Sequence, residues 1–114
     1  MSSFLNREQV RAKSKETLMS IINNESVDAA SKEAATQSLM ALSAIAEKEN
    51  AAETLLMAKG FADPVVSITD GKVDVVINAS SITDPQRAQI EDIVKRKTET
   101  GAENIVITLM NLQE

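Results

Sequence analysis

The stretch that decides the fold is VVSITDGKVDVVIN, residues 65–78. On both sides of Asp70-Gly71, apolar residues recur at every second position, which is the pattern of strands with one buried face. An Asp-Gly pair between such strands favours a type I′ turn, because both turn positions need a positive φ. Residues 65–69 and 72–78 are therefore predicted to form an antiparallel hairpin, with Val73, Val75 and Ile77 on one face.

A helix is predicted to follow the hairpin. Thr83 or Asp84 is a suitable N-cap, and Pro85 sits in the first turn, where its missing N–H costs nothing. Gln86 lies three residues after Thr83 and completes a capping box with it. The helix is predicted to run to about Thr98.

Helical periodicity dominates the chain before the hairpin. One helix is predicted over residues 6–22, and a second runs from an N-cap at Ser26 to about Glu49. Asn50 has the features of a new cap, so a kink or restart is predicted there. The short helix that follows is predicted to end at Gly60.

Residues 105–110, IVITLM, are predicted to form a third strand. The chain is thus expected to be an α+β protein, with N-terminal helices followed by an αββαβ unit whose two helices pack on one face of a three-stranded sheet. We divide it into an N-terminal helical segment, residues 1–49, and the αββαβ unit, residues 50–114, within one compact domain. The first strand is favoured for the middle of the sheet, and the chain order 1-2-3 is the alternative.

The composition excludes several classes of function. A net charge of −5 disfavours nucleic acid and anionic membrane surfaces as partners, and the two aromatic residues, Phe4 and Phe61, form no platform for stacking bases. The absence of His and Cys removes the usual general base, the thiolate nucleophile and most transition-metal ligands. We therefore predict no enzyme activity, no catalytic residues, no cofactor and no metal site. No apolar run approaches the roughly 20 residues of a membrane span, and a segment upstream of Met1 is left open.

Two groups of acidic residues are interpreted as structural and not as metal-binding or catalytic. Asp70 and Asp74 lack the spacing and the distal glutamate of a calcium-binding EF-hand. Glu47, Glu49 and Glu53 are interpreted as carboxylates on exposed helix turns and at a cap, with no paired acid and base between them.

The uncovered face of the sheet is the predicted docking surface. If both helices cover one face, the opposite face and the strand edges stay available to another protein. The predicted partner-binding residues are Lys72, Asp74, Val76, Asn78, Val106 and Thr108.

Several segments, in their order along the chain, carry a resemblance to a known family. They are RAKSKE (residues 11–16), residues 24–33, MALS (40–43), ETLL (53–56), KGFAD (59–63) and DGK (70–72). This combination resembles the soluble domain of stage III sporulation protein AH over about residues 11–111. The resemblance implies a fold similar to the ring-building domains of type III secretion basal bodies, and it implies no catalytic residues.

The resemblance also implies a location and a partner. Family members carry an N-terminal membrane span that anchors the domain in the outer forespore membrane, so that it projects into the intermembrane space. The implied partner there is stage II sporulation protein Q, and the implied function is assembly of a bridge or channel between mother cell and forespore. A homo-oligomeric ring is left open. The alternative is a ring-forming structural domain of a secretion-system or flagellar-type basal body unrelated to sporulation.

Overall fold

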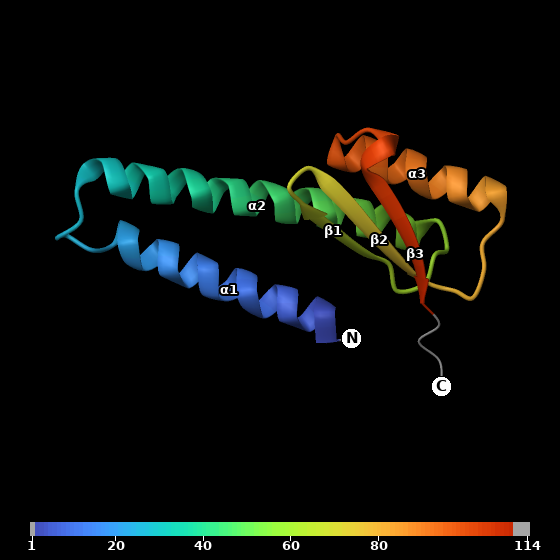
Figure 1. The fold of residues 1–114 in the computed structure, drawn as a ribbon, viewed down its shortest axis with the longest axis horizontal. Coiled ribbons are helices and arrows are strands. Elements are labelled where there is room, and N and C mark those ends of the chain that lie inside the picture. The colour runs from blue at the N-terminus through green and yellow to red at the C-terminus, as the bar shows by residue number, and fades with distance from the viewer. Residues whose placement is uncertain (1, 111–114) are drawn as a thin grey trace. The chain divides into compact units, whose positions relative to one another are not determined.

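A computed structural model describes the backbone of residues 2–110 and the side chains of residues 8–110. Its elements are α1 (Ser2–Ile22), α2 (Ala29–Ala58), β1 (Val65–Thr69), β2 (Lys72–Asn78), α3 (Asp84–Thr98), the short 3-10 helix η1 (Ala102–Asn104) and β3 (Ile105–Met110) (Figure 1). This is the predicted α+β fold, with helices followed by a three-stranded mixed sheet. The chain divides into two compact units, Met1–Ala46 and Glu47–Glu114, and the boundary lies inside α2.

The unit Met1–Ala46 is a helical hairpin. Helix α1 and the first part of α2 run antiparallel and are joined by residues 23–28 (Figure 1). In α2, Ala35 is buried while Leu39, Leu42 and Ile45 are half-buried. Among the described side chains of this unit, only Ala35 is fully buried, and the other apolar side chains are half-buried or exposed.

Helix α2 differs from the prediction in two places. It is capped by Asp28 and not by Ser26, because the Asp28 carboxylate accepts a hydrogen bond from the N–H of Ser31 at 3.3 Å. The predicted restart at Asn50 is wrong, since α2 is one continuous helix through that residue. Alanines flank Asn50 on its C-terminal side, and their high helix propensity outweighs a weak capping signal.

The strand order is β1-β2-β3, with β1 antiparallel and β3 parallel to β2. Placing the first strand in the middle was therefore wrong, and the alternative order is correct. The turn between β1 and β2 has a positive φ at both positions, 52° at Asp70 and 77° at Gly71, as predicted. This turn holds β1 beside β2. The side chains of Glu49 and Glu53 in α2 bond to the outer edge of β1, so β3 pairs with the free edge of β2 instead.

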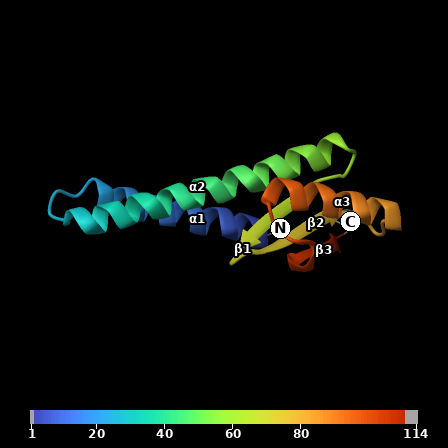
Figure 2. The same ribbon diagram turned by 90° about the horizontal axis from the view of Figure 1, so that it is seen from above.

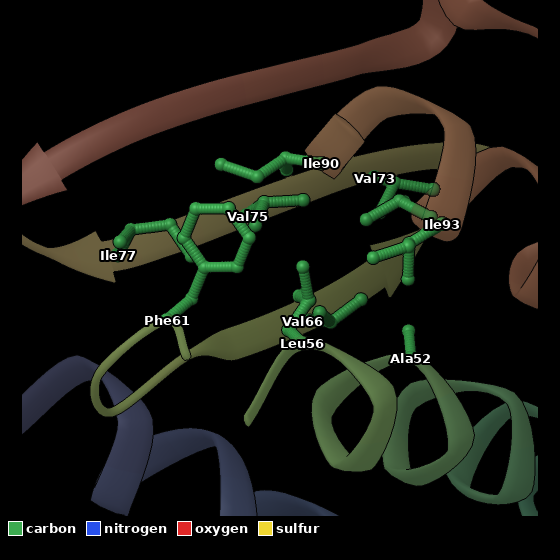
Figure 3. Close-up of a cluster of buried hydrophobic side chains, with 10 residues drawn as sticks. Ala52, Leu56, Phe61, Val66, Val73, Val75, Ile77, Ile90 and Ile93 are labelled. Atoms are coloured by element: carbon green, nitrogen blue, oxygen red, sulfur yellow. The ribbon is translucent and has the colours of Figure 1, made fainter. Parts of the chain in front are cut away.

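One face of the sheet carries the core. Ala52 and Leu56 of α2 and Ile90 and Ile93 of α3 lie against the strands (Figure 3), and both helices lie on the same side of the sheet (Figure 2). The prediction of two helices on one face is confirmed. Phe61 closes one end of this core, whereas the side chain of Phe4 lies outside the described residues. The core consists of Ala52, Leu56, Phe61, Val66, Val73, Val75, Ile77, Ile90, Ile93 and Val94.

Helix α3 begins as its sequence predicts. The Thr83 hydroxyl accepts from the N–H of Gln86 at 3.2 Å, and the Gln86 side chain accepts from the N–H of Thr83 at 2.8 Å, which completes the capping box. The helix ends at Thr98, as predicted, and the C-cap residue Glu99 has a left-handed backbone with φ 58°.

Candidate docking surface

The sheet face opposite the core brings the predicted docking residues together. The parallel register sets Asp74 beside Val106 and Val76 beside Thr108, while the residues between them point into the core. We call this surface the open face. It consists of Val65, Ser67, Thr69, Lys72, Asp74, Val76, Asn78, Val106, Thr108 and Met110.

The open face combines apolar and charged side chains. Val106 and Met110 on β3 are large apolar residues with exposed fractions of 54% and 40%. Lys72 and Asp74 are exposed on the neighbouring strand β2. Protein interfaces likewise combine apolar side chains with polar and charged ones.

Asn78 differs from the other predicted docking residues because it is tethered within the domain. Its side-chain amide donates to the carboxylate of Asp63 at 3.1 Å, and its backbone N–H donates to the carbonyl of Ala62 at 3.1 Å. These bonds hold the segment between α2 and β1 against the end of β2. Asn78 therefore has an internal structural role in addition to its place on the open face.

Two glutamates of α2, which we call the edge carboxylates, close the outer edge of β1. Glu53 accepts a hydrogen bond from the N–H of Val66 at 2.8 Å, and Glu49 accepts one from the N–H of Ile68 at 2.7 Å. Glu49 is only 3% exposed. Its interpretation as an exposed carboxylate is therefore wrong, and the reason is that it supplies an acceptor to the strand edge.

The spacing of the edge carboxylates matches the spacing of the strand. Residues four apart on a helix are separated by about 6 Å along its axis, and residues two apart on a strand by about 6.6 Å. Glutamates at positions i and i+4 therefore meet alternate backbone N–H groups of one edge. The sequence contains this glutamate pair in the last turns of the helix that precedes β1, but the spacing becomes informative only when the helix lies along that strand.

The opposite edge of the sheet, on β3, carries no such protection within the described part of the chain. Between residues 2 and 110, β3 pairs only with β2, and no side chain is seen bonded to its backbone. The β3 sequence IVITLM contains no charged residue. Natural edge strands usually carry charges, prolines or bulges that discourage pairing, so β3 has the features of an edge that receives a strand.

The described residues also bear on two other kinds of feature, metal sites and membrane-spanning helices. Among residues 8–110, no group of acidic side chains is arranged to hold a metal ion. No helix between residues 2 and 110 combines the length and the apolar character that a membrane crossing requires. The surface features that stand out are therefore the open face and the β3 edge.

A sheet with one covered face, one open face and one protected edge defines a protein-assembly module. A family model described as SpoIIIAH-like protein matches residues 4–107, and the chain belongs to this family. The family consists of structural channel proteins and not of enzymes, as the resemblance implied.

A solved structure supports the same fold. It is described as that of "the SpoIIQ-SpoIIIAH pore forming complex", and one of its chains is similar to this chain with a TM-score of 0.80 and 24% sequence identity. The similarity covers 95% of this chain and 93% of that chain. No protein with a curated description shows significant similarity to the sequence.

Proposed function

We propose that this domain is an assembly module of a sporulation channel and that it docks through its open face onto a SpoIIQ protein, stage II sporulation protein Q. The family assignment supports this function, and the related fold was solved in a complex of SpoIIQ and SpoIIIAH. The observation that carries the proposal is the register that gathers Lys72, Asp74, Val76, Asn78, Val106 and Thr108 on one uncovered face.

The chemistry of the open face suits a protein partner. Val106 and Val76 supply apolar area next to the charged pair Lys72 and Asp74. The chain has no Trp or Tyr, which dominate many interfaces. Aliphatic contacts and backbone pairing at the neighbouring β3 edge therefore contribute a larger share of the binding energy.

We place the domain in the intermembrane space, anchored in the outer forespore membrane, with its partner displayed from the forespore side. Tethering on opposed membranes raises the effective concentration of each partner, so individually weak contacts become strong together. On this basis the isolated domain is expected to be monomeric and to bind its partner with modest affinity. The alternative, a ring-forming domain of a basal body, predicts no binding to SpoIIQ.

The test is size-exclusion chromatography with light scattering, performed on this chain alone and after mixing with the SpoIIQ domain of the same organism. The proposal predicts a monomer alone and a heteromeric complex on mixing. If the elution and mass of both proteins stay unchanged at high concentration, the proposal is wrong.

A matched pair of variants tests the surface itself. Val106→Asp places a charge on the open face, and Met57→Asp places the same charge on α2 away from that face. Val106 and Met57 have similar exposed fractions, 54% and 56%. Burying an unpaired carboxylate in an interface should weaken binding by at least about tenfold for V106D, whereas M57D should bind like the wild type.

A further inference from the structure

Side chains of α2 bond to the backbone of one edge strand, β1, whereas the other edge strand, β3, has no such contacts within the described residues. Strand β1 is joined to β2 by a two-residue turn, so the N–H groups of Val66 and Ile68 point away from β2 in the antiparallel ladder. These are the N–H groups that the edge carboxylates Glu53 and Glu49 engage. A strand approaching β1 would find its hydrogen-bond donors already occupied by charged acceptors.

We infer that Glu49 and Glu53 close β1 to strand addition, so that this sheet is extended at β3 alone and a second copy of the chain is kept from pairing there. A new strand at β1 would have to displace two charge-assisted hydrogen bonds. It would also deprive the Glu49 carboxylate, which is 3% exposed, of the hydrogen bond that the N–H of Ile68 donates to it. The inference does not depend on the identity of the channel partner.

The closed edge restricts how copies of the chain assemble. Head-to-tail pairing of β3 of one copy with β1 of the next would continue the sheet from subunit to subunit. With β1 closed, sheet pairing between copies is limited to β3 with β3, which is symmetric and ends at a dimer. Any larger ring must therefore use contacts other than a continuous sheet.

The experiment removes the edge carboxylates from the full chain and uses a second copy as the probe. The double variant Glu49→Ala/Glu53→Ala is predicted to self-associate with rising concentration in sedimentation velocity, while the wild type does not. Glu47→Ala is the matched control, because Glu47 is an exposed glutamate of the same helix. If the folded double variant stays monomeric under conditions of the wild-type experiment, the inference is overturned.

A second pair of substitutions separates strand pairing from nonspecific aggregation. Val106→Lys and Thr108→Lys add charges to β3, and charged edge strands resist pairing. Added to the double variant, they are predicted to restore the monomer if β1 of one copy pairs with β3 of another. Self-association that persists in the quadruple variant would contradict pairing of β1 of one copy with β3 of another.

If the double variant does not fold, amide hydrogen exchange of the single variants tests the same inference. Glu53→Ala is predicted to raise the hydrogen-exchange rate of the Val66 amide by at least about tenfold, which corresponds to about 1.4 kcal/mol. The Ile68 amide, which is bonded to Glu49, should change much less. Equal rates for Val66 in the variant and the wild type would show that the carboxylate does not cover the edge.

Discussion

The carboxylate of Glu49 accepts a hydrogen bond from the backbone N–H of Ile68 at 2.7 Å, although one residue belongs to α2 and the other to β1. With 3% exposure, Glu49 is a buried acidic residue in a chain whose other described carboxylates are mostly exposed. A buried charge is tolerated when hydrogen bonds satisfy it. The contact ties the C-terminal half of α2 to the sheet that carries the proposed docking surface.

Removal of this contact should destabilise the domain. Glu49→Ala leaves the partly buried N–H of Ile68 without its carboxylate acceptor, and the expected loss is about 2 kcal/mol in the free energy of unfolding. Urea denaturation should show a lower midpoint with an unchanged slope. Glu47→Ala is the control and should lie within about 0.5 kcal/mol of the wild type. Equal midpoints for the two variants would show that the Glu49 bond does not stabilise the fold.

The hairpin turn should be sensitive to a side chain at Gly71. Its φ of 77° lies in the left-handed region, where a Cβ costs about 1 to 2 kcal/mol. Gly71→Ala should therefore lower thermal stability. Gly101→Ala is the comparison, because Gly101 has an ordinary φ of −70° and its new Cβ would meet only the flexible side chain of Glu103. A larger loss of stability for Gly101→Ala than for Gly71→Ala would contradict this account of the turn.

The start of α2 should be sensitive to acid. Hydrogen bonds from the Ser31 side chain and then from its backbone N–H lower the pKa of Asp28 below its usual 3.8. Because the folded-state pKa is the lower one, the stabilisation is fully present above 3.8 and is lost as the pH falls through the folded-state pKa.

An NMR titration of the Asp28 carboxyl carbon measures this shift directly. The expected midpoint lies below that of an unstructured peptide of the same sequence. The variant Asp28→Asn still caps the helix but does not titrate, so its α2 N-terminus should show no such acid-dependent loss. A midpoint equal to or above the peptide value would show that the cap is not formed in solution.

The local structure of the αββαβ unit follows closely from the sequence. The turn at Asp70-Gly71, the capping box at Thr83 and the alternation in the strands each depend on neighbouring residues, and the structure confirms them. The open face is also predictable, because the apolar positions of β2 define which of its residues face away from the core. Family membership was recognised from the order of short segments.

The strand order and the edge carboxylates could not be predicted in the same way. Both depend on where α2 lies relative to β1, which is set by packing between segments far apart in the chain. Asn50 and Glu53 have the spacing of a cap, but Glu53 bonds to Val66 of β1 and the helix continues through both residues. Glutamates with this spacing occur at helix caps, on exposed helix faces and along strand edges. Which of these roles they have depends on the packing of the helix in the folded protein.

We propose that this domain binds a SpoIIQ protein through the open face of its sheet. The most direct test is an NMR titration of the isotopically labelled domain with the SpoIIQ domain of the same organism. If the open face is the binding surface, amide signals of residues 72–78 and 105–110 will shift or broaden together, while those of α3 remain close to their unbound positions. Changes confined to α3 or to the helical hairpin, with residues 72–78 and 105–110 unaffected, would contradict it.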